Sequence, residues 1–226
     1  ASPVVLVKKH DGKLSFCVDY RKLNAVTRKD SYPMPRVDEV LESLGGAKLF
    51  TSLDLQSGFW QVDLDEDAKA KSAFTCNQGL FQFKQMPFGL TNAPATFQRL
   101  MDCVLAGLTG IICLVFIDDI VIYTKTTVEQ HLYDVHTVLK LLLWAGLKVK
   151  GSKCKFARSQ LPFLGHIISA EGIQPDTQHV KAIVECPAPK DLHQTRSFLG
   201  LAGYYRRFIR EYAKIAGPIT KLLKQG

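Results

Sequence analysis

The feature that most constrains this chain is an apolar run, residues 111–123, that is interrupted by two adjacent aspartates. Seven apolar residues, many of them β-branched, precede Asp118 and Asp119, and four strand-forming residues follow. This pattern predicts a β-hairpin that bends at the aspartate pair and is buried along most of both arms. Because aspartate tolerates the positive φ of tight turns, one interpretation is a purely structural turn.

Electrostatics favours a second interpretation of the same pair. Two like charges on a hydrophobic hairpin repel each other and lose hydration, and a nearby cation relieves both costs. Mg²⁺ is bound through one or two carboxylates together with substrate phosphates. The hairpin therefore calls for a third acidic residue, and Asp54 follows a predicted strand over residues 48–53. Its carboxylate can point into a cleft beside a tight turn, or it can simply cap a helix.

Composition narrows the class of protein and of partner. The chain has 226 residues, of which 46% are hydrophobic and 22% charged, as in an ordinary globular protein. A net charge of +8 favours a polyanionic partner such as nucleic acid or an acidic membrane surface. No segment approaches 18 uninterrupted apolar residues and no leader pattern opens the chain, so we expect no membrane span, no secretion signal and an intracellular location.

The cysteines and histidines predict no metal site. None of the six cysteines forms a C-x-x-C pair or shows zinc-finger spacing with the six histidines. His131 and His136 are five residues apart and do not share a helical face. The cysteines are therefore interpreted as small core residues of a reducing compartment.

Periodicity and turn residues predict the order of elements. The first half contains a β-hairpin over residues 4–20, an extended connection over 24–36, a helix over 37–44, strand-like alternation over 61–64, an exposed acidic turn at 65–67 and a hairpin over 74–83. A helix from Pro94 to about Leu105 follows, and a capping box at Thr126 and Glu129 opens another. We expect its apolar face to consist of Val128, Leu132, Val135, Leu139 and Leu142.

One or two further strands are predicted, including residues 163–168. The order from residue 48 to 168 is then the split βαβ, ferredoxin-like pattern, in which the strand ending at Asp54 lies beside the aspartate hairpin. Short helices over 176–185, 191–208 and 212–224 complete the chain. Basic and aromatic residues alternate in this last region, which suits a nucleic-acid backbone or merely a solvated helical face.

Three convergent aspartates predict two divalent ions that clamp the attacking and leaving oxygens of a phosphoryl transfer. Several longer motifs occur together with these aspartates. They are residues 52–59 (SLDLQSGF), 86–98 (MPFGLTNAPATFQ), 116–119 (FIDD), 163–166 (FLGH) and 196–208 (RSFLGLAGYYRRF). In this order they resemble the reverse transcriptase of gypsy-type LTR retrotransposons, over essentially the whole chain.

The resemblance implies an α+β, right-hand polymerase fold with partial fingers, a ferredoxin-like palm and a helical thumb or connection. Residues 1–170 would be N-terminally truncated fingers and palm, and residues 171–226 a thumb-like region leading toward a missing RNase H domain. The implied activity is RNA-directed DNA polymerisation, which adds deoxynucleotides to a primer 3′-hydroxyl. The implied cofactor is two Mg²⁺ ions, with Mn²⁺ as the alternative. Implied partners are an RNA or DNA template with primer, deoxynucleoside triphosphates, and downstream RNase H and integrase regions of a parent polyprotein; no membrane is implied.

The resemblance also assigns roles to individual residues. Metal binding is implied for Asp54, Asp118 and Asp119 and for the backbone carbonyl of Leu55, and protonation of the pyrophosphate leaving group for Lys153. Nucleotide-binding roles are implied for Lys9, Leu55, Phe59, Phe88 and Gly89, with Phe59 as the gate that excludes a ribose 2′-hydroxyl. A primer grip is implied for Phe163, Leu164 and Gly165, and contacts to the nucleic-acid backbone for Arg196, Arg206 and Arg207.

Three positions depart from the family pattern. Ser15 stands where relatives commonly carry an arginine, and Leu14 stands where an aromatic residue often precedes it. Gly151 replaces a proline that usually precedes Ser-Lys-Cys. Serine can neither stack on a base nor bind phosphate bidentately as arginine does. A non-catalytic nucleic-acid-binding remnant of a retrotransposon therefore remains the alternative to an active polymerase, and a nuclease on the same carboxylates is disfavoured.

Overall fold

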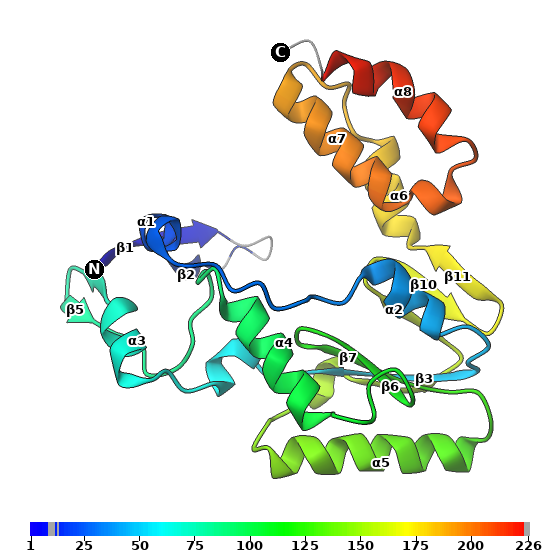
Figure 1. Ribbon diagram of the computed structural model, residues 1–226, viewed down its shortest axis with the longest axis horizontal. Coiled ribbons are helices and arrows are strands. Elements are labelled where there is room, and N and C mark those ends of the chain that lie inside the picture. The colour runs from blue at the N-terminus through cyan, green and yellow to red at the C-terminus, as the bar shows by residue number, and fades with distance from the viewer. Residues whose placement is uncertain (9–11, 13, 224–226) are drawn as a thin grey trace. The chain divides into compact units, whose positions relative to one another are not determined.

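The computed structural model describes residues 1–8, 12 and 14–223 and divides into two compact units, Ala1–Ser159 and Gln160–Gly226 (Figure 1). The second unit begins with a β-hairpin, and this hairpin pairs with a third strand of the same unit. The boundary between the two units therefore lies before residue 170, the predicted end of the fingers and palm. The assignment of residues 1–170 to fingers and palm, and of 171–226 to the thumb, stays a prediction.

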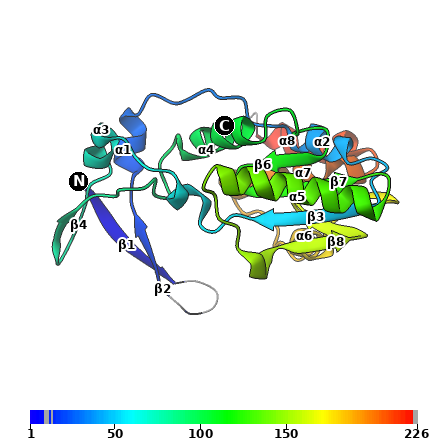
Figure 2. The same cartoon turned by 90° about the horizontal axis from the view of Figure 1, so that it is seen from below.

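The larger sheet of the first unit has the predicted ferredoxin-like pattern, but its last strand comprises residues 155–158 and not the predicted residues 163–168. It consists of β3 (Leu49–Asp54), β6 (Cys113–Phe116), β7 (Asp119–Thr124) and β8 (Lys155–Arg158), arranged β6-β7-β3-β8. The helices α4 (Ala93–Val104) and α5 (Val128–Trp144) connect β3 to β6 and β7 to β8 in the chain. All pairs in this sheet are antiparallel. Figure 2 shows the strands side by side with α5 running across them.

Both helices pack on one face of this sheet. Alternate residues of the strands point to the same face, and the alternating pairs Leu53 with Leu55 and Ile120 with Ile122 are all buried. They join Phe97 and other residues of α4 and α5 in one hydrophobic cluster. Asp54 follows Leu53, and Asp119 precedes Ile120, so these two aspartates lie on the opposite face, away from the helices.

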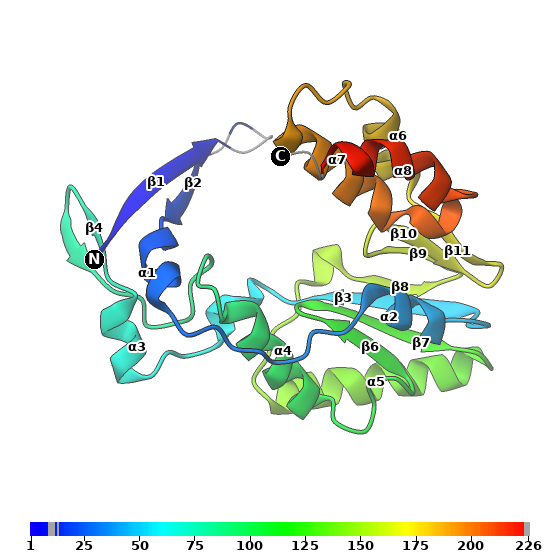
Figure 3. The same cartoon turned by 45° about the horizontal axis from the view of Figure 1, so that its top comes forward.

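The second sheet of the first unit confirms the two predicted hairpins. Strand β1 (Ser2–Lys8) pairs with β2 (Leu14–Val18), and β4 (Phe74–Cys76) pairs with β5 (Gly79–Phe81). The sheet order is β2-β1-β4-β5 (Figure 3). The predicted turn residue Asp11 lies outside the described residues.

Three local predictions in the first unit are wrong. The connection predicted as extended begins with a helix, α1 (Arg21–Val26), and the acidic turn is the start of α3 (Glu66–Lys71). In place of strand-like alternation over 61–64, the chain forms the 3₁₀ helix η1 (Gly58–Gln61) and a single bridge at Asp63. The helix α2 (Val37–Ser43) is confirmed.

The predicted face and cap of α5 are also corrected. The capping residue is Thr127, whose hydroxyl accepts from the backbone N–H of Gln130, so the cap lies one residue later than Thr126. Val128 and Leu132 are more than half exposed, whereas His131 and Asp134 are buried. A polar network with the sheet draws these two residues inward, and that network has no signature in the apolar pattern.

The second unit combines a three-stranded sheet with helices. Strands β9 (Gln160–Phe163), β10 (His166–Ser169) and β11 (Gly172–Pro175) have the order β11-β10-β9. The prediction of one or two strands here is confirmed in kind, but residues 163–168 are not one continuous strand, because the chain turns at residues 164 and 165. The strand β11, just before the first predicted helix, was not predicted. The helices α6 (Thr177–Val184), α7 (Leu192–Tyr204) and α8 (Tyr212–Leu222) confirm the three predicted helices, with the 3₁₀ helix η3 (Arg206–Phe208) after α7.

No helix in the described part of the chain combines the length and the apolar character needed to cross a membrane.

Candidate active site

The pairing of β3 with β7 brings two of the predicted metal ligands together. Asp54, the last residue of β3, is the cross-strand partner of Asp119, the first residue of β7. Side chains of directly opposed residues share one face of a sheet, with Cβ atoms roughly 4.5–5.5 Å apart. The prediction that the strand ending at Asp54 lies beside the aspartate hairpin is confirmed.

The hairpin turn lies one residue earlier than predicted. Because Phe116 pairs with Asp119, the two turn residues are Ile117 and Asp118, and Asp119 already belongs to the strand. The residue with positive φ is Ile117, at 58°. A β-branched residue in this left-handed region is a conformational outlier, and two-residue turns of this kind normally place glycine there.

The turn that follows β3 fits closely against Asp118. A Cβ placed on Gly58 would lie 3.2 Å from the Cβ of Asp118 and 3.1 Å from the ring of Phe97. Any larger residue at position 58 would therefore push against the aspartate or against the buried ring. Glycine is needed here for the close approach of the two turns, and the three aspartates consequently occupy neighbouring ends of β3 and β7.

Charges in this region are coupled. Partial desolvation, together with the charges of Asp118 and Asp54, raises the pKa of Asp119, and Lys153 partly opposes the rise. Lys153, at the end of the 3₁₀ helix η2 (Gly151–Lys153), donates from Nζ to Oδ2 of Asp54 at 2.9 Å. This bond raises the pKa of Lys153. The lysine ammonium thus supplies positive charge next to a cluster of carboxylates.

The donor chemistry suits a hard divalent ion, since carboxylate and carbonyl oxygens are the ligands that Mg²⁺ prefers. Within the described ranges, no three His, Cys, Asp or Glu side chains are grouped closely enough to hold an ion as they stand. One oxygen of Asp54, a predicted ligand, accepts from Lys153.

The segment after Asp54 is fixed by a side chain that the sequence analysis missed. Gln61 donates from Nε2 to the carbonyl oxygens of Gln56 and Lys148, at 2.8 and 3.0 Å, and accepts from the backbone N–H of Lys148 at 2.6 Å. Backbone bonds on either side of Leu55 continue this link, and Leu55 forms an isolated bridge with Val149. The peptide of Leu55 and the segment that leads to Lys153 are therefore held together.

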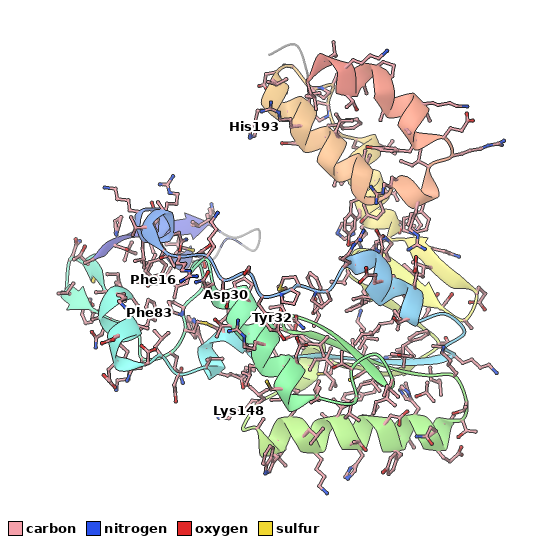
Figure 4. The ribbon with its side chains drawn as sticks, viewed as in Figure 1. Phe16, Asp30, Tyr32, Phe83, Lys148 and His193 are labelled. Carbon is pink, nitrogen blue, oxygen red and sulfur yellow. The ribbon has the colours of Figure 1, made fainter. Side chains whose placement is uncertain are left out.

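The residues predicted to surround the nucleotide form an aromatic cluster. The ring centre of Phe59 lies 5.2 Å from that of Phe88 and 5.5 Å from that of Phe97. Beside this cluster is a cavity of about 250 Å³. It is lined by Ser15, Phe16, Cys17, Val18, Trp60, Phe83, Pro87, Phe88 and Gly89. Phe16 and Phe83 are labelled in Figure 4. The structure thus brings together Ser15, Phe88 and Gly89 around one cavity.

Of the remaining predicted residues, Lys9 lies outside the described residues. Phe163, Leu164 and Gly165 lie at the β9–β10 turn of the second unit, where Leu164 and Gly165 both have positive φ. The three arginines that were predicted to contact the nucleic-acid backbone are all exposed. They are Arg196 in α7, and Arg206 and Arg207 in η3.

Comparison with known proteins identifies relatives along nearly the whole chain. Residues 7–168 match the family described as reverse transcriptase (RNA-dependent DNA polymerase). The Pol polyprotein of transposon 297 from Drosophila melanogaster is 45% identical over 98% of this chain, and that of transposon gypsy from the same organism is 45% identical over 92%. The chain spans about a fifth of the length of these relatives, 21% and 20% respectively.

The solved structures that resemble this chain include reverse transcriptases as well. A foamy viral protease–reverse transcriptase in complex with double-stranded DNA matches with a TM-score of 0.89 and 29% identity, covering 100% of this chain and 39% of that one. Its complex with an RNA/DNA hybrid matches with a TM-score of 0.84 and 28% identity, covering 100% and 30%. The fold is therefore that of a right-hand polymerase, and the chain belongs to the reverse transcriptase family.

Proposed function

We propose that this chain catalyses RNA-directed DNA synthesis, with Asp54, Asp118 and Asp119 as the metal-binding catalytic residues. The observation that carries the proposal is the register of β3 and β7, which sets Asp54 opposite Asp119 with Asp118 in the adjoining turn. Membership of the reverse transcriptase family supports it.

The proposed cofactor is a pair of Mg²⁺ ions, or Mn²⁺ in their place. Two such ions, when bound, lower the pKa of the primer 3′-hydroxyl and neutralise charge on the departing pyrophosphate. The aspartates hold the charge of the site in a fixed place, and the fixed peptide of Leu55 offers its carbonyl oxygen as a further ligand. Asp54 would hold an ion together with Asp118 and Asp119, and Lys153, whose ammonium donates to Oδ2 of Asp54, would supply the proton for the leaving group.

Substrate binding is proposed for the aromatic cluster and for the second unit. Phe59 closes the space where a ribose 2′-hydroxyl would lie, which favours deoxynucleotides, and Phe88 and Gly89 support the nucleotide and template base. The β9–β10 turn, with Phe163, Leu164 and Gly165, would grip the primer terminus. Complexes of the foamy viral neighbours with double-stranded DNA and with an RNA/DNA hybrid support a primer–template as partner.

The test is primer extension on poly(rA)/oligo(dT) with Mg²⁺. Asp118→Asn removes a charged ligand and is expected to reduce extension by about 10²–10³-fold or more, comparable with removing one group that stabilises transition-state charge. Asp67→Asn serves as the control, because it removes the same charge from the exposed first turn of α3. Equal activity of Asp118→Asn and the unaltered chain would exclude the proposed metal site.

A remnant that only binds nucleic acid remains the second candidate, and Ser15 is the observation that favours it. Ser15 lines the cavity beside Phe88, where it offers a hydroxyl in place of a guanidinium. If only Ser15→Arg extends the primer, the missing phosphate contact explains an inactive chain. If no variant extends the primer while primer–template binding persists, the remnant function replaces the polymerase function.

A further inference from the structure

The Ile117–Asp118 turn carries backbone strain next to the candidate metal ligands. Ile117 has a φ of 58°, and left-handed conformations of β-branched residues persist only where surrounding contacts hold them. One such contact is plain: the backbone N–H of Ile117 donates to Oε1 of Gln98 at 2.7 Å. The backbone of the turn is therefore bonded to helix α4 through Gln98, and the side chain of Ile117 packs against the hydrophobic cluster.

Gln98 is fully buried, and its amide has only one consistent orientation. The N–H of Ile117 requires an acceptor, which is the amide oxygen. The carboxylate of Asp102, one helical turn away, requires a donor and accepts from Nε2 of Gln98 at 2.9 Å. Both ends of the amide are thus engaged by partners of opposite hydrogen-bonding character, so the side chain cannot flip without losing both bonds.

Asp102 is held in turn by the segment that precedes α2. The hydroxyl of Tyr32 donates to Oδ2 of Asp102 at 2.6 Å. The backbone N–H of Tyr32 donates to Asp30, whose carboxylate also accepts from Arg99 at 2.6 Å. The guanidinium of Arg99 lies 4.6 Å from the centre of the Tyr32 ring. Figure 4 shows Asp30 and Tyr32 beside α4.

We propose that Gln98 is a positioning residue that keeps the turn at residues 117 and 118 in its left-handed conformation. By fixing this turn, Gln98 sets where the carboxylates of Asp118 and Asp119 lie, while Asp102 fixes Gln98. Through this chain of hydrogen bonds, the segment around Tyr32 also helps to hold the active-site turn in place. This inference rests on the proposed polymerase function for its consequence in catalysis, but its structural part is independent of activity.

The first variant is Gln98→Met, which keeps the length of the side chain and removes its hydrogen bonds to Ile117 and Asp102 and the longer one, at 3.5 Å, to the carbonyl of Val115. We expect kcat for primer extension on poly(rA)/oligo(dT) to fall by 10- to 100-fold, and the Mg²⁺ concentration for half-maximal rate to rise at least threefold. Primer–template affinity should change by less than twofold. A purely structural loss would lower the amount of active protein without moving the Mg²⁺ midpoint.

The chain offers a matched control in α5. Gln130 donates from Nε2 to Oδ1 of Asp134 at 2.8 Å, the same four-residue spacing as in the Gln98–Asp102 pair. Its backbone N–H donates to Thr127, so these bonds lie within α5 and its cap and do not involve the catalytic turn. Gln130→Met should therefore leave kcat and the Mg²⁺ midpoint within twofold of the unaltered chain. If Gln98→Met behaves like Gln130→Met, the proposal is overturned.

Exchanging the amide of Gln98 and the carboxylate of Asp102 tests the direction of the hydrogen bond between these two residues. Gln98→Glu keeps an acceptor for the N–H of Ile117 but sets two carboxylates against each other, so it should be as impaired as Gln98→Met. Adding Asp102→Asn restores a donor toward position 98 and keeps an acceptor for the hydroxyl of Tyr32. The double variant should have a kcat at least tenfold higher than that of Gln98→Glu alone. An equal kcat would contradict the proposed chain of hydrogen bonds.

Amide hydrogen exchange separates this proposal from the proposed function. The N–H of Ile117 should be protected in the unaltered chain and in Gln130→Met, and should exchange at least tenfold faster in Gln98→Met. If the unaltered chain shows no extension but this pattern holds, the polymerase function fails and the positioning role of Gln98 stands. Unchanged protection of Ile117 in Gln98→Met overturns the positioning role.

Discussion

At the scale of single residues, His131 shows how a buried polar group joins the sheet of the active site to its covering helix. Its Nδ1 lies 2.9 Å from the hydroxyl of Thr124, which itself donates to Asp134, so the hydroxyl oxygen must accept from Nδ1–H. Its Nε2 lies 2.8 Å from the hydroxyl of Thr51 and is then free to accept. The neutral imidazole with its proton on Nδ1 therefore satisfies both contacts.

This arrangement predicts a loss of stability in mild acid. Burial lowers the pKa of His131 below its usual 6.5, so the unfolded chain takes up a proton before the folded chain does. As pH falls below about 6.5, the free energy of unfolding should therefore decrease, by at most about 1.4 kcal/mol per pH unit from this group. Urea unfolding at pH 7.5, 6.5 and 5.5 should show a smaller dependence on pH in His131→Gln than in the unaltered chain.

The exposed neighbour His136 provides the control for this titration. His136 lies on the solvent-exposed side of α5. In His136→Gln the free energy of unfolding should therefore depend on pH as it does in the unaltered chain. A pH dependence that is the same in all three proteins would assign the acid sensitivity to other groups.

Sequence alone predicted the charged residues of the site but not the side chains that support them. The Asp118–Asp119 pair stands out because charges interrupt an apolar strand, and its turn was placed only one residue too late. Gln98 and Gln61 gave no signal, because a glutamine in a helix or loop usually faces solvent. Only tertiary packing shows that their amides bind backbone groups of the active-site turns.

At the scale of elements, the β9–β10 turn depends on the helices that follow it. The hydroxyl of Tyr204 donates to the carbonyl of Leu164 at 2.7 Å, and that of Tyr205 donates to the carbonyl of Gly165 at 3.1 Å. Tyr205 is 4% exposed, so it serves this packing and is not available to stack on a nucleic acid. A turn in which both residues have positive φ is thus fixed by two phenols from the end of α7 and the residue after it.

Substitution at Gly165 should test this support. A Cβ at this position would lie 2.7 Å from the hydroxyl of Tyr205, and its φ is 70°. Gly165→Ala should therefore destabilise the second unit by about 1–3 kcal/mol. In a Tyr205→Phe background the steric part disappears, so the same substitution should cost about 1 kcal/mol less. Hydrogen exchange of the β9 and β10 amides, read in denaturant, measures both costs.

Gly200 in α7 is the matched control, because a Cβ there meets nothing within 4 Å. Gly200→Ala should be neutral or stabilising by up to about 1 kcal/mol, as expected for a helix interior. Equal costs for Gly165→Ala with and without the Tyr205 hydroxyl would show that the contact does not constrain the turn.

Elements with a clear period were predicted, whereas elements fixed by tertiary contacts were not. The strands β3, β6 and β7 of the larger sheet and the helices α4, α5 and α7 were found from apolar spacing and capping residues, whereas the strand β8 was not. The short helix α1 was missed because Asn24 holds it in place, donating to the carbonyl of Gly89 and accepting from the N–H of Thr91. These partners are more than 60 residues away in the chain.

At the scale of the whole molecule, charge predicts how the chain meets its proposed partner. The net charge of +8 gives a long-range attraction to nucleic acid that does not depend on base sequence. Specific phosphate contacts add to it, and each neutralised phosphate of a duplex makes the slope of log K against log salt steeper by about 0.9. The long-range attraction and the phosphate contacts can be separated. Removing a side chain that contacts a phosphate changes the slope of log K against log salt by a fixed increment, whereas removing a distant charge does not.

Arg196 is the residue on which to make this separation. Arg196→Gln should weaken binding to a primer–template uniformly across template sequences, and should reduce the magnitude of the salt slope by about 0.9. Lys140→Gln removes the same charge from the exposed side of α5 and should leave the slope unchanged, with only a small loss of affinity. Fluorescence anisotropy between 50 and 300 mM KCl, roughly the range over which such slopes are resolved, measures both. Equal slopes for the two variants would mean that Arg196 acts through net charge alone, and the proposed backbone contact would be withdrawn.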